Sequence, residues 1–362
     1  MNAGRNSAVR STALAALLAL GLAACTLPGA IPHVPAAPAS PNPPAPPTPP
    51  TVRPAPDDSK RVCAYTYHRI DQLAAYSAQI GRDIDCAFVY NSAAPDWASW
   101  AQPWFIVHGD PNLNWAKWKR AVPGRRLIIT QGLIPSGAPS DWRQRGASGE
   151  YDGHVETFGA NLVAAGLGDS IIRLAPEANG TWNKDTIGDT PAEFAAWRAY
   201  WARTARTLRA VPGAQFRLDW TVNANFRPIP FDSYYPGDDV VDIIGIDVYD
   251  FWPWPNPPRN TMARWYGQYL QPAGMRDLVE YATRHHKSLS IPEWALSAPG
   301  HAGGIGDNPE FIDEIARIVR THDVAYQSYF LWTTDVGMLL TDAPNSLATY
   351  RRHFGADGDS VG

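Results

Sequence analysis

After residue 60 the chain alternates short apolar runs with longer segments in which apolar residues recur at helical spacing. The apolar runs are rich in β-branched residues and are short enough for strands that are buried on both faces. This alternation predicts a parallel sheet covered by helices. Eight such runs lie at about residues 62–67, 85–90, 126–131, 170–175, 215–222, 241–248, 288–292 and 325–332.

Eight alternations in one domain favour a closed barrel over an open, doubly wound sheet. No glycine-rich phosphate loop follows the first run, and the Gly303-Gly304-Ile305-Gly306 stretch is a weak signal. The chain from residue 61 onward has roughly 300 residues, the usual size of one (β/α)8 barrel. We therefore predict a single α/β domain, a (β/α)8 or TIM barrel, over residues 61–358.

Several connecting segments carry helix start and stop signals. The segment Thr190-Pro191-Ala192-Glu193 combines a capping box with proline at the first helical position. Asn308-Pro309 predicts another helix start, and Gly81 and Gly166 predict the ends of two earlier helices. The alternation is thus supported by local signals as well as by hydrophobicity.

The N-terminal segment has the layout of a bacterial export signal. Arg5 and Arg10 precede a small-apolar run over residues 13–24, which is too short to span a membrane. The run ends in Leu-Ala-Ala-Cys, which resembles a lipobox and predicts lipid attachment at Cys25. Residues 1–25 are therefore expected to be a lipoprotein signal peptide; the alternative is an unlipidated export signal in which Cys25 is incidental.

Residues 26–60 are dense in proline and alanine and predict a semi-rigid, extended linker. Beyond the linker the chain has two cysteines, Cys63 and Cys86. In an exported protein we expect them to form a disulfide rather than to remain as free thiols.

The charge pattern excludes one class of partner. The chain has 31 basic and 35 acidic residues and no basic cluster, so we expect no nucleic-acid partner. We expect contact with a membrane only through the lipid. We also expect a monomer.

Two apolar runs end in the same motif: a proline, a glutamate and then a tryptophan nearby. The first, residues 170–182, carries Glu177, and the second, residues 289–296, carries Glu293. Because these runs are the fourth and the seventh, both glutamates are expected at the C-terminal rim of the barrel, where such barrels keep their chemistry. The alternative is two solvated loop glutamates.

Two carboxyl groups on one rim can hydrolyse a glycosidic bond if one is protonated while the other is ionised. Arg173 lies four residues before Glu177 on the same strand and is a candidate cation for keeping a carboxylate ionised. The alternative for Arg173 is a buried ion pair with Asp219 or Asp247. His154, His285, His286 and His301 show no metal-ligand spacing, and we expect neither a metal ion nor a cofactor.

The chain has 15 tryptophans, and many fall where strands are expected to end. The apolar face of a sugar ring packs well on an indole, so these residues predict an open glycan cleft. The alternative for any one of them is a place in the core. The tryptophans at predicted strand ends are Trp182, Trp220, Trp252, Trp254, Trp294 and Trp332.

The chain resembles glycoside hydrolase family 26 over most of residues 61–355. In that family the fourth strand carries an arginine, the acid/base glutamate four residues later, then Asn-Gly and a tryptophan; Arg173, Glu177, Asn179, Gly180 and Trp182 keep this spacing. The resemblance implies that Glu177 is the acid/base and that Asn179 and Trp182 contact the substrate.

The resemblance extends to the later strands. Residues 237–250 resemble the sixth strand of the family, which implies that Tyr249 orients the nucleophile. Glu293 matches the nucleophile, and Trp332 matches the aromatic residue that floors the subsite of the attacked sugar. Trp252 and Trp294 are further candidates for sugar contacts.

One residue departs from the family pattern: Pro176 stands where the family has a histidine that grips the sugar. The resemblance implies a retaining endo-β-glycanase, with β-1,4-mannan as the first expectation and β-1,3-1,4-glucan or β-1,3-xylan as alternatives. Two further alternatives are a non-catalytic glycan-binding lipoprotein and an enzyme that remodels the envelope glycans of the producing cell.

Overall fold

The computed structural model describes residues 60–91, 94–224, 226–252, 260–299, 301, 303–331 and 338–356. The predicted signal peptide, Cys25 and all of the predicted linker except Lys60 lie outside these residues, as do Trp254 and Trp332.

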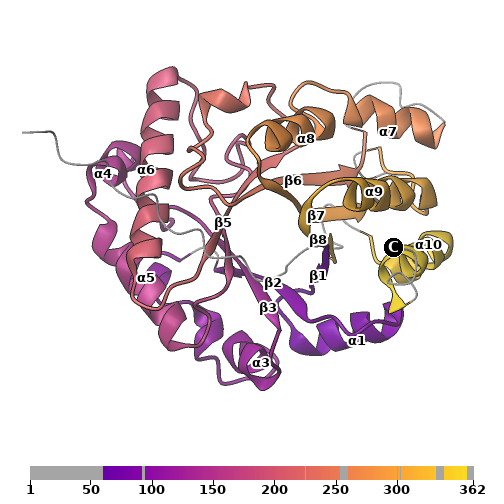
Figure 1. Cartoon of the computed structure of the whole chain (residues 1–362), viewed down its shortest axis with the longest axis horizontal. Coiled ribbons are helices and arrows are strands. Elements are labelled where there is room, and N and C mark those ends of the chain that lie inside the picture. Colours follow the sequence, from indigo (N-terminus) through magenta and orange to yellow (C-terminus); the bar gives the residue numbers. More distant parts are fainter. Residues whose placement is uncertain are drawn as a thin grey trace, which may run out of the picture. The chain divides into compact units, whose positions relative to one another are not determined.

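Eight parallel strands form a closed barrel in sequential order, and β8 pairs with β1 to complete it (Figure 1). The prediction of a (β/α)8 barrel is therefore confirmed. The strands are β1 (Arg61–Tyr65), β2 (Cys86–Asn91), β3 (Arg126–Gln131), β4 (Ile171–Leu174), β5 (Arg217–Asn223), β6 (Ile243–Asp250), β7 (Ser288–Leu296) and β8 (Val324–Phe330).

Helices surround the strands in Figure 1. They are α1 (Ile70–Ile80), α2 (Trp97–Ala101), α3 (Trp115–Ala121), α4 (Trp142–Ser148), α5 (Asp152–Ala164), α6 (Pro191–Ala210), α7 (Thr261–Tyr269), α8 (Met275–Arg284), α9 (Pro309–Thr321) and α10 (Pro344–Phe354), with short 3-10 turns η1 (Trp104–Ile106), η2 (Phe231–Ser233) and η3 (Leu340–Asp342). Within the part of the chain that the structure describes, no helix has the length and apolar character needed to cross a membrane.

The helix signals read from the sequence act as expected. The hydroxyl of Thr190 accepts from the backbone N–H of Glu193, and the carboxylate of Glu193 accepts from the backbone N–H of Thr190. The helix α6 therefore begins with a capping box. Asn308 caps α9 by accepting from the N–H of Phe311. The helix α1 ends at Gly81, whose φ of 73° is left-handed.

β7 differs from the strand that the sequence predicts. It runs on through Pro292 and Glu293 to Leu296 instead of ending before the proline. The register against β8 shifts between Ile291 and Trp294, since proline has no N–H to donate to the ladder. Glu293 therefore sits at an irregularity within a strand, not in the loop after it.

A polar cluster lies inside the barrel. The carboxylate of Asp219 accepts from the hydroxyls of Thr221 at 2.9 Å, Ser290 at 2.7 Å and Tyr326 at 2.6 Å, and all four residues are buried. Burial raises the pKa of Asp219, while these hydrogen bonds lower it. Such a hydrogen-bonded layer offers a polar base for charged groups at the rim.

Cys63 and Cys86 are joined by a disulfide between β1 and β2, where the two residues are register partners. Their Cα atoms are 4.5 Å apart, and both side chains are buried. The bond closes a loop that contains all of α1. It thus links the first two strands of the barrel covalently.

Replacing both cysteines by alanine should lower the free energy of unfolding by about 3 kcal/mol, because a cross-link that spans 23 positions no longer restricts the unfolded chain. Chemical denaturation of the wild type and the double variant measures the difference. The wild type in reductant should fall to the stability of the variant; equal midpoints for all samples would show that the bond contributes nothing.

Candidate active site

Three donors converge on the carboxylate of Glu293. The hydroxyl of Tyr249 donates to Oε2 at 2.8 Å, while Arg173 Nη1 and the hydroxyl of Tyr90 both donate to Oε1. Arg173 and Tyr249 stand where the resemblance implies, on β4 and β6, whereas Tyr90 comes from the end of β2. Two donors on one oxygen and one on the other fix the carboxylate and leave Oε2 the less occupied oxygen.

Glu177 lies just beyond β4 on a strained turn. Ala175 and Glu177 both have positive φ, 47° and 52°, which non-glycine residues seldom adopt. Oε1 of the Glu177 carboxylate accepts from Asn223 Nδ2 at 2.5 Å, and Oε2 accepts from Trp182 Nε1 at 2.8 Å. The turn therefore orients the Glu177 carboxylate, and hydrogen bonds from Asn223 on β5 and from Trp182 in the loop after β4 hold it.

The structure brings both glutamates and a third carboxylate together. One carboxylate oxygen from each of Glu177, Asp247 and Glu293 lies within 4.8 Å of the others. These three carboxylates could in principle ligate a cation. Arg173, however, already supplies positive charge to Asp247 and Glu293. The arrangement is a carboxylate cluster arranged around one buried guanidinium.

Arg173 is fully buried and lies between two of these carboxylates. Nη2 donates to Asp247, Nη1 donates to Glu293, and Nε donates to Thr221 Oγ1 at 3.2 Å. Burial alone would lower the pKa of Arg173, but the charges of Asp247 and Glu293 raise it well above its usual value. Of the two acidic partners that the sequence left open, Arg173 pairs with Asp247 and not with Asp219.

Glu177 and Glu293 have different electrostatic surroundings. Desolvation raises the pKa of Glu177, and repulsion from Glu293 raises it further; Arg173 and the hydrogen bonds from Asn223 and Trp182 oppose the shift. Glu293 has the Arg173 guanidinium bonded directly to it. One carboxyl group is thus biased toward its protonated form, while the other has a cation bound to its carboxylate.

Two predicted substrate contacts are wrong. Trp294 is fully buried, donates from Nε1 to Gln327 Oε1 at 2.6 Å and stacks on Tyr350. Asn179 is also fully buried, and its amide donates to the carbonyl of Asn223 and accepts from the N–H of Asn223, both at 2.9 Å. Trp294 is a core residue, and Asn179 positions the strand end that carries Asn223.

Trp182 and Trp252, which were also predicted to contact the substrate, lie in surroundings that differ from those of Trp294. Trp182 is 49% exposed and meets Phe226, itself 43% exposed, edge to face with ring centres 4.7 Å apart. Trp252 packs on α7, where a Cβ at Gly267 would lie 2.5 Å from its ring. Its contact with a substrate stays a prediction.

Sequence reasoning missed Tyr90 and Asn223. Each lies at the C-terminal end of a strand, β2 and β5, so position on the rim was the available signal. Neither residue type is distinctive alone. Their bonds to Glu293 and Glu177 depend on strand register, which a single sequence does not fix.

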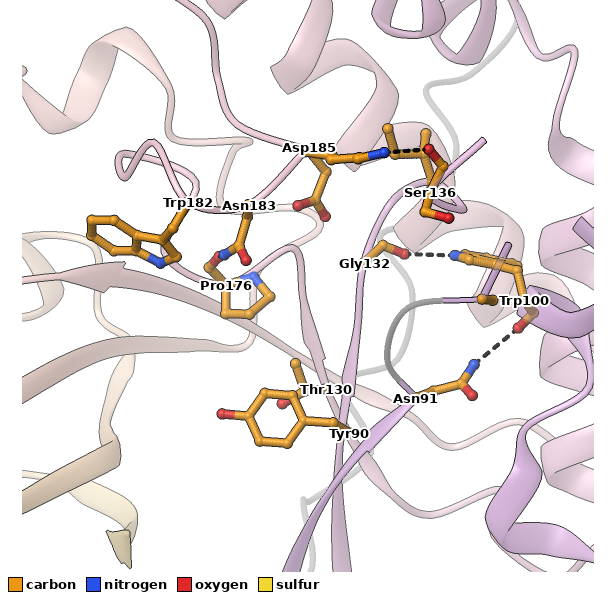
Figure 2. Close-up of a pocket in the computed structure, with 13 residues that line it drawn as sticks. Tyr90, Asn91, Trp100, Thr130, Gly132, Ser136, Pro176, Trp182, Asn183 and Asp185 are labelled. Carbon is orange, nitrogen blue, oxygen red and sulfur yellow. Dashed lines mark hydrogen bonds between the residues drawn. The ribbon is translucent and has the colours of Figure 1, made fainter. Parts of the chain in front are cut away.

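A pocket of about 370 Å³ is lined by residues from the ends of β2 and β3 and from the loop after β4, and Figure 2 draws them. It lies next to Glu177 in the chain, since Pro176 lines it and Trp182, another lining residue, donates to Glu177. Trp182, Asn183 and Pro176 form one wall and Tyr90 and Thr130 lie near its foot (Figure 2). The remaining lining residues are Asn91, Ala94, Trp100, Gly132, Ile134, Ser136, Lys184 and Asp185.

Polar groups line the pocket. The Thr130 hydroxyl is buried and has no hydrogen-bond partner among the described residues, and Lys184 Nζ donates to the Ser136 carbonyl at 2.6 Å. An indole together with polar groups in one pocket suits a sugar ring.

No protein-family model matches the chain, and no curated protein sequence matches it. Solved structures do match. They include a modular endo-β-1,4-mannanase of glycoside hydrolase family 26 from Cellulomonas fimi (15% identity, TM-score 0.56, covering 83% of this chain and 72% of that one). Another is the catalytic domain of a Bacillus sp. JAMB-750 GH26 endo-β-1,4-mannanase (15%, 0.55, 84% and 90%).

A third matching structure is GH26C from Muricauda sp. MAR_2010_75, at 14% identity and a TM-score of 0.55, covering 83% of this chain and 87% of that one. At these identities the likeness establishes the fold. The chain is therefore a (β/α)8 barrel whose fold is like that of the family 26 glycoside hydrolases.

Replacing Glu177 by glutamine should change how stability depends on pH. The folded-state pKa of Glu177 is raised, so its contribution to stability is fully present below the unfolded pKa and is lost as pH rises through the folded pKa. The melting temperature of Glu177→Gln relative to wild type should therefore increase from about pH 4 to about pH 8.

Glu193→Gln is the control for this pH series, because the pKa of Glu193 is lowered by the hydrogen bonds of the capping box. The contribution of Glu193 to stability is complete above the unfolded pKa of a glutamate, so the melting temperature of Glu193→Gln relative to wild type should stay constant above about pH 5 and should rise only below it. A constant difference for Glu177→Gln across the series would contradict the raised pKa.

Proposed function

We propose that the chain is a retaining endo-β-glycanase that hydrolyses a β-linked polysaccharide, with β-1,4-mannan as its substrate. The observation that carries the proposal is the pair Glu177 and Glu293, whose carboxylate oxygens lie within 4.8 Å in opposite electrostatic settings. Retaining enzymes have carboxyl groups about 5 to 5.5 Å apart, whereas inverting enzymes leave room for a water between them.

In the first step Glu293 attacks the anomeric carbon and forms a covalent ester, while Glu177 gives its proton to the departing glycosidic oxygen. Oε2 is the attacking atom, because Oε1 already accepts from Arg173 and Tyr90 and Oε2 accepts only from Tyr249. The raised pKa of Glu177 keeps its proton available for the leaving group.

In the second step Glu177, now ionised, removes a proton from water, and the hydroxide oxygen attacks the anomeric carbon and releases Glu293. Asn223 and Trp182 donate to the two oxygens of Glu177, so they hold the carboxylate in one orientation. Two inversions at the same carbon give net retention of configuration.

Two of the three family 26 structures reported above are named as endo-β-1,4-mannanases, which supports β-1,4-mannan as the substrate. The pocket beside Glu177 and the aromatic pair of Trp182 and Phe226 support a place for a sugar on the leaving-group side. Pro176 supplies no side-chain donor at the cleavage point, so mixed-linkage β-glucan and β-xylan are the alternative substrates.

The sequence supports a location for this activity. The export signal and Cys25 favour a lipid-anchored protein at the cell surface, tethered by its proline-rich linker. We propose a monomer that acts on polysaccharide within reach of that tether.

Purified enzyme should release reducing ends from one member of a panel of β-mannan, mixed-linkage β-glucan and β-xylan. Glu293→Ala should lower kcat by roughly 10⁴-fold or more, because the covalent step loses its nucleophile. Proton NMR of the first product should show the anomeric configuration of the substrate.

Three results would count against the proposal: full activity in Glu293→Ala, an inverted first product, or saturable binding to a glycan without release of reducing ends. The last result would favour a glycan-binding surface protein. Glu293→Ala removes a partner of the buried Arg173 and lowers stability, so the assay is run at a temperature where circular dichroism shows the variant folded, and a loss of activity there is chemical.

A further inference from the structure

Arg173 has two carboxylate partners, and solvent can replace neither. The side chains of Arg173 and Asp247 are fully buried, and that of Glu293 is 9% exposed. The remaining donor bond of Arg173 runs from Nε to Thr221. A guanidinium in such a place needs a fixed counter-ion at every stage of the reaction.

The counter-ions of Arg173 change during the proposed reaction. When Glu293 forms its ester with the anomeric carbon it loses its negative charge, and Glu177 becomes negative as its proton goes to the leaving oxygen. The new anion lies close to the cluster, since an oxygen of Glu177 is within 4.8 Å of oxygens of Asp247 and Glu293. Without another partner Arg173 would be drawn to Glu177 and would make that carboxylate a weaker base.

We infer that Asp247 is a positioning residue that holds Arg173 in place while Glu293 is an ester, and so leaves Glu177 free to act as the base. This inference rests on the proposed function. Asp247 Oδ2 accepts from Arg173, and Oδ1 has no hydrogen-bond partner within the described part of the chain. The interaction of Asp247 with Arg173 is thus the main hydrogen-bonded contact of this buried carboxylate.

The neighbouring buried carboxylate, that of Asp219, does not hold Arg173 in place. Asp219 is the register partner of Arg173 on β5, but its oxygens accept from Thr221, Ser290 and Tyr326. Asp219 makes no hydrogen bond to Arg173: the two are linked through the Thr221 hydroxyl, which donates to Asp219 and accepts from Arg173 Nε, and otherwise only through the attraction of their charges.

The negative charge near Asp247 moves from one glutamate to the other during the reaction. Burial and the charges of Glu293 and Glu177 raise the pKa of Asp247 well above its usual value, and the charge of Arg173 opposes them. Because ester formation neutralises Glu293 while Glu177 becomes ionised, the bond from Arg173 remains the interaction that favours the ionised form of Asp247.

A double-mutant cycle tests the shared counter-ion without any substrate. Glu293→Gln imitates the uncharged ester in shape, and Asp247→Asn removes the other charge. Either single variant leaves Arg173 one carboxylate, whereas the double variant leaves it none. The melting temperature of the double variant should fall by at least roughly 5 °C more than the sum of the two single effects.

Asp250→Asn is the matched control for the cycle. Asp250 is also buried on β6, but it faces Arg264 at 3.7 Å and Asn308 at 2.8 Å. Combined with Glu293→Gln it should give additive changes. An additive result for Asp247→Asn as well would overturn the inference.

Kinetics then separate positioning from a merely structural role. With an aryl glycoside of the active sugar and a good leaving group, Asp247→Asn should show a burst of phenol, and kcat should fall roughly 10²-fold together with KM. Azide needs no base to attack the ester, so it should restore turnover.

An equal loss in kcat and kcat/KM, with no rescue by azide, would contradict the inference. A wild-type chain that is inactive on every glycan overturns the proposed function and the reaction role of Asp247 with it. The stability cycle still reports in that case whether Asp247 and Glu293 share Arg173.

Discussion

The site depends on one buried cation. Arg173 lies inside the rim of the barrel, bonded to Glu293 and Asp247 with no exposed surface of its own. A buried pair of this kind contributes little net stability, because removing charges from water costs about as much as their attraction returns, but breaking it is strongly destabilising. The interaction therefore fixes where Glu293 points, and the polar layer around Asp219 supports it from below through Thr221.

A second constraint is the strained turn after β4. Ala175 and Glu177 adopt left-handed backbone conformations on either side of Pro176. Backbone bonds hold the turn to the neighbouring strands: the N–H of Ala175 donates to Gln131 at 2.8 Å, and that of Glu177 donates to Thr221 at 3.0 Å. Strain of this kind persists where the surrounding structure over-determines it. In this chain it turns the Glu177 carboxylate toward the cluster around Arg173.

The barrel fold and the two glutamates of the site could be predicted from the sequence, because eight apolar runs and two Pro-Glu motifs are local features of the chain. The errors have physical causes. Successive side chains of a strand face opposite ways, so once Glu293 faces the barrel rim, Trp294 must enter the core. The amide of Asn179 is used by the backbone of Asn223, which depends on the packing of two strand ends. The contact between Tyr90 and Glu293 spans 203 residues and depends on barrel closure.

The central claim is that Glu293, held by Arg173, is the carboxylate that bonds to the sugar. A 2-deoxy-2-fluoro glycosyl fluoride of the active sugar slows the second step and should trap the ester, and mass spectrometry of the digested protein can then locate the label. The account predicts one label, on Glu293. A label on Glu177 or on Asp247 would contradict it.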